Sequence, residues 1–252
     1  MSQEEAVKSI VDKMWDPKAE RFCDGVCDDP KVAGKHSVYS DMYSLWLGMV
    51  PQPARPGVWR HVAQHGMTAL GDYGVFVYLS ALASDPAVDG GEAILTALTK
   101  CDNFSWCETM KLWDATMTRE SLQVSLQHPT MSHAWGTSPV IGAVNGLLGL
   151  SQTSPGFGTF SVRPRLGGLA FAAAKVPTAH GPVVINATER STEVHVPCNT
   201  LASLCAIAPP LEEQADVDLA LDGAVLHAES VRFEGHHACV DTLGCGEAGR
   251  AR

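Results

Sequence analysis

Several patterns are missing from this chain of 252 residues. It has no run of lysines and arginines, and its net charge is -10, whereas binding to nucleic-acid phosphates requires a basic surface. It has no apolar stretch of the ~18–20 residues needed to cross a bilayer. Its first residues are acidic and contain no apolar core of a secretory signal. We therefore expect a protein that binds neither nucleic acid nor membrane. Its default location is the cytoplasm, although the residues do not determine the compartment.

Cysteine pairs at zinc-like spacing are also missing. The chain has eight cysteines, and two local motifs contain metal-binding side chains: Cys23 with Cys27, and His236 and His237 with Cys239. Neither motif has a second pair at the spacing of a zinc site. Without a secretory signal, free thiols are the default interpretation. The sequence therefore predicts free cysteines, no metal ion and no cofactor.

Tryptophan and tyrosine are absent from the second part of the chain. All six Trp and all four Tyr lie at or before Trp135, and only Phe remains after it. Hydrophobic residues make up 45% of the chain, which is enough to bury a substantial core. The two parts are therefore built differently, and any surface that stacks on sugars belongs to the first.

The first part is predicted to be helix after helix. Ser2 and Glu5 form a capping-box pattern that begins a helix through about Met14. Further apolar faces at helical spacing, with short polar connections, indicate helical hairpins. The predicted helices cover residues 39–50, 58–66, 72–82, 91–101, 105–113 and 138–148.

The pattern changes after residue 153. Short runs of strand-forming residues alternate with Gly, Pro and Asn turns, and their spacing predicts an antiparallel β-sandwich. The expected division is helices over residues 1–153, the sandwich over 154–240 and a loose tail over 241–252. The predicted strands cover residues 158–164, 167–172, 181–188, 191–197, 201–208 and 228–235.

The segment from Trp113 to Trp135 has neither helical nor strand periodicity for most of its length. It contains Glu120 beside Arg119, and His133 in a polar loop. A long irregular segment inside a helical region commonly builds a functional site. It is the first candidate for a site in this chain.

Four segments in this order resemble the C-terminal part of bacterial-type alpha-L-rhamnosidases, the inverting enzymes of glycoside hydrolase family 78. A D-G loop leads to H-S and a helix ending in L-G-M-V-P. S-W-C-E-T-M and W-D-A-T-M-T-R-E-S are similar to the family's stretch around its general base. S-H-A-W-G-T-S-P follows, and L-G-L-S-Q-T-S-P-G-F-G-T-F-S-V-R-P is similar to the junction into the family's C-terminal β-domain. These segments span residues 22–51, 105–121, 132–139 and 148–164.

The resemblance implies a fold of several domains, helical and then β. The family's catalytic domain is an (α/α)6 toroid of six helical hairpins, and residues 1–153 would supply only the later ones. Uncovered apolar helix faces are then expected. The sequence leaves three alternatives open: a truncated fragment, a chain that associates with itself or another protein, and a shortened stable form.

The resemblance also implies roles for individual residues. Glu120 matches the general base, and His133 matches a histidine that binds rhamnose. Trp113 and Trp135 are candidates for stacking on sugar, and Arg119 for tuning the charge of Glu120 or binding substrate. The alternatives are a solvated Glu–Arg pair, a structural histidine and two core tryptophans. Asp24 and His36, near the expected rim of the toroid, are weaker candidates.

One element of the family's chemistry is not found. Its general acid lies in an upstream acidic loop of the form D-G…R…R, and Asp24-Gly25 is followed by V-C-D-D-P, which does not match. We expect a glycosidase of the alpha-L-rhamnosidase type that acts on a rhamnose-containing glycoside, represented here without its acid. The alternative is a non-catalytic remnant that binds carbohydrate or is purely structural, so whether this chain is an enzyme stays open.

Overall fold

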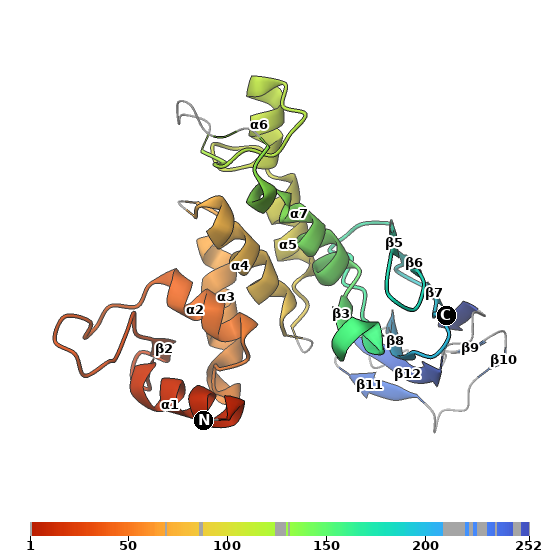
Figure 1. Ribbon diagram of the computed structural model, residues 1–252, viewed down its shortest axis with the longest axis horizontal. Helices are drawn as coiled ribbons and strands as arrows, with labels where there is room; N and C mark the ends of the chain where they lie inside the picture. The colour runs from red at the N-terminus through yellow and green to blue at the C-terminus, as the bar shows by residue number, and fades with distance from the viewer. Residues whose placement is uncertain are drawn as a thin grey trace. The chain divides into compact units, whose positions relative to one another are not determined.

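The structure of the protein is a computed structural model that describes residues 2–68, 70–85, 88–123, 130, 132–208, 220–221, 224–225, 231–234, 236–243 and 248–251. Helices come first and mainly antiparallel sheets follow (Figure 1), in the order that the sequence predicts. The chain forms two compact units. The first is Met1–Asp85 with Ala97–Pro139, and the second is Pro86–Thr96 with Val140–Arg252.

The helical part contains seven α-helices and three short helices of other types in the residues described. The α-helices are α1 (Gln3–Met14), α2 (Val38–Trp46), α3 (Arg55–His65), α4 (Asp72–Ala83), α5 (Gly91–Thr99), α6 (Trp106–Trp113) and α7 (Pro139–Ile141). The others are η1 (Gln52–Ala54), η2 (Ala134–Thr137) and η3 (Gly142–Leu147), which continues α7 as a π-helix. A small hairpin of β1 (Trp15–Asp16) and β2 (Arg21–Phe22) follows α1.

Helix α4 is the centre of the first unit. It packs against α2 and α3 (Figure 1), and its side chains are buried on most faces, including Val75, Tyr78 and Leu82. The indole N–H of Trp59 on α3 donates to the carbonyl of Leu82 at 3.2 Å. A helix that is apolar all round is stable only inside a core, so α4 positions the elements on either side of it.

Helix α1 begins as the sequence predicts. The Ser2 side chain accepts from the backbone N–H of Glu5, and the Glu5 side chain accepts from the backbone N–H of Ser2, so the capping box is complete. None of the residues of α1 is fully buried. Among the described helices, none combines the length and apolar character that a membrane span requires.

The second unit contains a five-stranded and a four-stranded sheet. The strand orders are β11-β12-β8-β4-β3 and β13-β7-β6-β5, and a short pair joins β9 and β10. Strands β4 and β8 are parallel, and the other described pairs are antiparallel. The strands are β3 (Leu150–Gln152), β4 (Thr159–Val162), β5 (Phe171–Val176), β6 (Val183–Thr188), β7 (Thr192–His195), β8 (Leu201–Ile207), β9 (Ala220–Leu221), β10 (Ala224–Val225), β11 (Arg232–Glu234), β12 (His237–Leu243) and β13 (Ala248–Ala251).

Both sheets contribute to one hydrophobic core. Buried residues of β6, such as Ile185, join Phe160 of β4 and Leu204 of β8 in the same cluster. Leu148, directly after η3, is part of this cluster, and Val144 packs against it. The last helix therefore shares the core of the sheets, and the second unit contains residues from Val140 onward together with Pro86–Thr96.

A glycine permits the transition from η3 into β3. Gly149 has a φ of +64°, and a Cβ there would lie 1.8 Å from the carbonyl oxygen of Arg163. The backbone N–H of Arg163 donates to the carbonyl of Gly149 at 3.1 Å. Only glycine combines this backbone conformation with so close an approach.

Two expectations from the sequence differ from the structure. Residues 241–243 belong to β12, and β13 pairs with β7, so the segment expected to be a loose tail contains paired backbone. The prediction of free thiols is wrong for six cysteines, because the structure contains the disulfides Cys23–Cys27, Cys101–Cys107 and Cys205–Cys239. The last pair faces across neighbouring strands β12 and β8.

Candidate active site

The irregular segment after α6 folds back on itself. The backbone N–H of Glu120 donates to the carbonyl of Thr130 at 2.9 Å, and that of His133 donates to the carbonyl of Thr118 at 2.7 Å. The Thr118 hydroxyl donates to the carbonyl of His133 at 2.5 Å. These bonds bring the backbones that carry Glu120 and His133 side by side, although 13 positions separate them in the chain.

Glu120 is exposed and held ionised. Its Oε2 accepts from the Thr130 hydroxyl at 2.6 Å and from the Thr130 backbone N–H at 3.2 Å. These hydrogen bonds, with the nearby His133, lower the pKa of Glu120 below its ordinary value. A carboxylate that keeps its charge can accept a proton, and it is poorly suited to donate one.

Exposed aromatic rings lie beside His133. The ring of His133 lies 5.2 Å from that of Trp135, centroid to centroid, and Trp135 lies 5.0 Å from Tyr73 of α4. Trp135 is 55% exposed and Tyr73 is 48% exposed. Rings of this size are normally buried in a core, whereas these two are exposed in the structure.

The rings continue along α2. Tyr43 lies 6.3 Å from Trp46, and Trp46 lies 5.4 Å from Phe76 of α4. Burial and a hydrogen bond with Tyr73 raise the pKa of Tyr43 to about 12. We call this set the aromatic strip; its members are Tyr43, Trp46, Tyr73, Phe76 and Trp135.

Asp72 is a site residue that sequence reasoning did not single out. It is buried at the start of α4, and its Oδ1 accepts from the backbone N–H of Leu122 at 3.0 Å. Burial raises the pKa of Asp72, and the charge of Glu120 raises it further, whereas His133 and Arg119 lower it. Asp72 thus fixes the backbone two residues after Glu120. Its position at a predicted helix start gave it a structural interpretation, and nothing local linked it to residue 122.

The structure does not place the side chains of Arg119 and Trp113 on the surface beside Glu120. Arg119 is only 3% exposed, so its guanidinium acts inside the fold and contributes to the charge around Asp72. Trp113 is the last residue of α6, and its side chain lies outside the described part of the chain. Its role as a wall of the pocket stays a prediction.

Trp106 and Gly136 hold η2 against the segment of Glu120. The indole N–H of Trp106 on α6 donates to the carbonyl of Gly136 at 3.0 Å. A Cβ on Gly136 would lie 2.8 Å from Cβ of Thr118 and 2.9 Å from the carbonyl oxygen of Arg119. The glycine in S-H-A-W-G therefore allows a close approach that positions His133 and Trp135.

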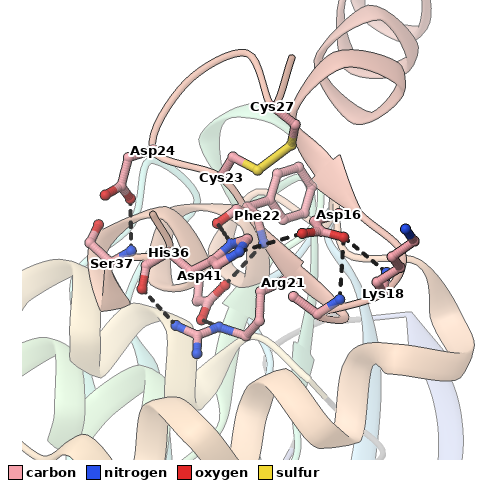
Figure 2. Close-up of polar contacts among 11 residues, drawn as sticks. Asp16, Lys18, Arg21, Phe22, Cys23, Asp24, Cys27, His36, Ser37 and Asp41 are labelled. Atoms are coloured by element: carbon pink, nitrogen blue, oxygen red, sulfur yellow. Dashed lines mark hydrogen bonds and ion pairs between the residues drawn. A yellow bond between two sulfur atoms is a disulfide. The ribbon is translucent and has the colours of Figure 1, made fainter. Parts of the chain in front are cut away.

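Asp24 and His36 belong to a different polar network (Figure 2). Asp24 accepts from the backbone N–H of Ser37 at 2.7 Å and from the Ser40 hydroxyl at 2.8 Å, at the start of α2. The His36 ring contacts the carbonyl of Phe22 and the carboxylate of Asp16. Asp24 therefore ties its loop to the start of α2, and both side chains organise the loop between β2 and α2.

The second unit matches a known domain family in sequence. A family model described as the bacterial alpha-L-rhamnosidase C-terminal domain matches residues 149–217. The match begins at the glycine that leads into β3. No curated protein sequence matches the chain.

The fold of the chain is similar to that of solved alpha-L-rhamnosidases. The alpha-L-rhamnosidase from Dictyoglumus thermophilum matches with a TM-score of 0.68 at 16% identity, over 98% of this chain and 27% of that protein. The Streptomyces avermitilis alpha-L-rhamnosidase, solved with L-rhamnose bound, matches with a TM-score of 0.63 at 18% identity, over 89% of this chain and 22% of that protein. The family 78 rhamnosidase of Bacillus sp. GL1 matches with a TM-score of 0.55 at 17% identity, over 77% of this chain and 20% of that protein.

The chain therefore resembles the C-terminal region of alpha-L-rhamnosidases, as its sequence motifs indicate. It spans between 20% and 27% of the length of these three solved proteins. At such identities the likeness shows the fold alone. The roles of the side chains depend on the geometry of the site.

Proposed function

We propose that this chain is the C-terminal portion of a glycoside hydrolase of the alpha-L-rhamnosidase type, which hydrolyses terminal alpha-L-rhamnosyl bonds with inversion. The helices would be later hairpins of an (α/α)6 toroid, and the two sheets would be its C-terminal β-sandwich. The observation that carries the proposal is one loop that joins an exposed, ionised carboxylate, Glu120, to His133 and the exposed ring of Trp135.

Glu120 acts as the general base in this proposal. An inverting glycosidase activates a water molecule that attacks the sugar from the face opposite the leaving group, while an acid protonates the leaving oxygen. Glu120 would accept the proton of that water. Thr130 keeps the carboxylate ionised and fixes its orientation, which leaves one carboxylate oxygen, Oε1, for the water.

His133 and the aromatic strip bind the sugar. Rings of Trp135 and Tyr73 offer apolar faces to the C–H face of a deoxysugar. The imidazole of His133, beside Trp135, supplies a hydrogen-bonding group at the edge of that surface. This is the combination of apolar and polar groups that a carbohydrate site needs.

We assign the general acid to a segment outside this sequence, in the acidic loop that the resemblance places upstream. The acid should lie roughly 6.5–9.5 Å from Glu120 to leave room for water. Asp72 does not take this role, although its pKa is raised. Its carboxyl is buried and its Oδ1 already accepts from Leu122, so it positions the loop and does not reach a substrate.

The second candidate is a non-catalytic remnant that binds carbohydrate. The exposed rings of Trp46, Tyr73 and Trp135 favour sugar binding by this chain alone. The burial of Arg119 removes one candidate contact to substrate. A lone base without its acid partner would be slower by orders of magnitude.

Release of nitrophenol from an aryl alpha-L-rhamnoside tests the first candidate. The wild-type chain should release nitrophenol slowly, and Glu120→Gln should abolish that release. Glu189→Gln, which changes an exposed glutamate in the turn after β6, is the matched control and should leave it unchanged. Equal release by the wild type and Glu120→Gln would rule out Glu120 as the base.

Titration with L-rhamnose distinguishes the second candidate function from the first. Binding without release of nitrophenol, lost in both His133→Ala and Trp135→Ala, supports the remnant. Absence of both binding and release from the folded chain contradicts both candidates for the chain alone.

The uncovered face of α1 also leaves self-association as a prediction, and sedimentation velocity at several protein concentrations tests it.

A further inference from the structure

Three side chains with metal-binding atoms meet where the β1–β2 hairpin packs against the loop before α2. They are Asp16 at the end of β1, Cys23 directly after β2, and His36 two residues before α2. One potential ligand atom from each lies within 4.8 Å of the others (Figure 2). The cluster is separate from the loop of Glu120, so a metal site here would not depend on the proposed function.

The imidazole of His36 is oriented as a metal ligand would be. Its Nδ1 lies 3.1 Å from the carbonyl oxygen of Phe22. A carbonyl only accepts, so Nδ1 carries the proton and Nε2 keeps its lone pair in the neutral ring. Metal-binding histidines commonly use this second contact to fix their orientation. The other ring nitrogen, Nε2, lies 3.5 Å from Oδ2 of Asp16.

Asp16 presents one oxygen to the cluster and uses the other for the backbone. Its Oδ1 accepts from the backbone N–H of Lys18 at 2.9 Å and of Ala19 at 3.3 Å. Oδ2 therefore faces His36. A tetrahedral zinc ion with bonds of about 2.0–2.3 Å places its ligand atoms roughly 3.3–3.8 Å apart, and the Asp16–His36 distance already falls in this range.

Cys27 supplies the fourth group. It is joined to Cys23 in the disulfide, and both backbones are tied to the end of α1. The backbone N–H of Cys23 donates to the carbonyl of Met14 at 2.8 Å, and that of Cys27 donates to the carbonyl of Lys13 at 2.9 Å. These bonds do not depend on the disulfide, so the backbones of both cysteines stay tied to the end of α1 when it is reduced, and the sulfur of Cys27 remains next to that of Cys23.

The guanidinium of Arg21, beside the loop of His36, is paired with a carboxylate. Arg21 forms a buried ion pair with Asp41, and its guanidinium also donates to the carbonyl of His36 at 3.2 Å. Arg21 therefore braces the loop of His36, and its charge does not repel a cation.

We propose that the reduced Cys23 and Cys27, with His36 Nε2 and Asp16 Oδ2, form a tetrahedral zinc site. A dithiol reductant delivers two electrons and two protons to the disulfide and leaves as its own disulfide. Zn²⁺ then displaces the two thiol protons and binds both thiolates. The disulfide and the zinc complex are alternative closed states of the same loop, selected by the supply of reductant and metal.

Cobalt binding tests the site directly. The whole chain is reduced with a phosphine that does not bind the metal, and Co²⁺ is added without oxygen. One Co²⁺ per chain should bind with a thiolate-to-cobalt absorption band and the intense visible bands of a tetrahedral complex, and Zn²⁺ should displace it. The oxidised chain should show neither band.

Four variants locate the ligands. Cys23→Ser should abolish the thiolate band, and His36→Gln and Asp16→Asn should weaken Co²⁺ binding by about 10-fold or more. Asp16→Asn keeps the oxygen that accepts from Lys18, so it decides the question if Cys23→Ser does not fold. Cys107→Ser, in the disulfide Cys101–Cys107 of the same unit, should bind as the wild type does. No thiolate band in the reduced wild type, or equal binding by wild type and Asp16→Asn, overturns the site.

Discussion

At the scale of single residues, Thr130 lowers the pKa of Glu120. Both of its donors bond to the same carboxylate oxygen, and the hydroxyl is the largest cause of the lowered pKa. Thr130→Val removes the hydroxyl and keeps the backbone donor. The pKa of Glu120 should rise toward its ordinary value, and the acidic limb of any Glu120-dependent activity should move to higher pH.

An NMR titration of the Glu120 side chain measures this change without requiring activity. Thr137→Val is the control, because the Thr137 hydroxyl donates to the carbonyl of Ala134 rather than to Glu120. An unchanged pKa of Glu120 in Thr130→Val would show that the hydroxyl does not hold its charge.

The pKa of Asp72 is shifted in the opposite direction to that of Glu120. Because burial raises its pKa in the folded chain, the folded state binds its proton more tightly than the unfolded state. The associated stability is fully present below the ordinary pKa of aspartate and is lost as pH rises through the raised value. Asp72→Asn keeps the acceptor for Leu122 and carries no charge, so its stability relative to the wild type should increase from acidic to neutral pH.

Asp72→Ala is the contrasting variant. It leaves the buried N–H of Leu122 without its acceptor, which should cost about 1–3 kcal/mol. Denaturant unfolding of both variants at acidic and neutral pH measures the difference. Equal losses in Asp72→Asn and Asp72→Ala at neutral pH would contradict an acceptor role for Asp72.

At the scale of elements, η2 carries Trp135 and begins directly after His133, the two residues that we propose to bind the sugar. Gly136→Ala should push η2 away from Thr118 and Arg119, because its Cβ would lie within 3 Å of both. We expect weaker binding of L-rhamnose with an otherwise folded chain, since His133 and Trp135 lose their position. Calorimetric titration measures the change in affinity for L-rhamnose.

Gly57→Ala is the matched control for this substitution. Gly57 lies in α3, and a Cβ there would contact nothing within 4 Å. Its replacement should leave binding unchanged and stabilise α3 by about 0.4–1 kcal/mol. Unchanged binding by Gly136→Ala would mean that η2 does not position the site.

At the scale of the whole molecule, the disulfides close loops of very different length. Cys205 and Cys239 are 34 residues apart, whereas the other two pairs are 4 and 6 residues apart. A disulfide restricts the unfolded chain more when its loop is longer. Double serine variants should lose about 4 kcal/mol for the long loop and about 2 kcal/mol for each short one.

Denaturant unfolding with peptide mapping of the disulfides measures these losses. The double alanine variant of Cys205 and Cys239 separates chain entropy from the burial of a polar hydroxyl, because both sulfur atoms lie in a buried part of the sheet. Equal losses for the three serine variants would contradict the dependence on loop length.

The prediction from sequence was accurate where a pattern is local. The capping box at Ser2, the helical faces and the order of helices followed by sheets depend on residues within one or two turns of each other, and the structure contains them. Strands β3, β12 and β13 were not predicted, because the tendency of a segment to form a strand depends strongly on the neighbour it pairs with.

The sequence by itself determined the helical and β parts of the chain, the absence of Trp and Tyr from the second, and a loop with Glu120, His133 and Trp135. It also carried the family motifs, since motifs are runs of neighbouring residues. Only the tertiary structure decided the burial of Arg119, the bond from Asp72 to residue 122, the three disulfides, and the meeting of Asp16, Cys23 and His36. The reason is physical: burial, charge and ligand geometry depend on groups that are distant in sequence and become neighbours only when the chain folds.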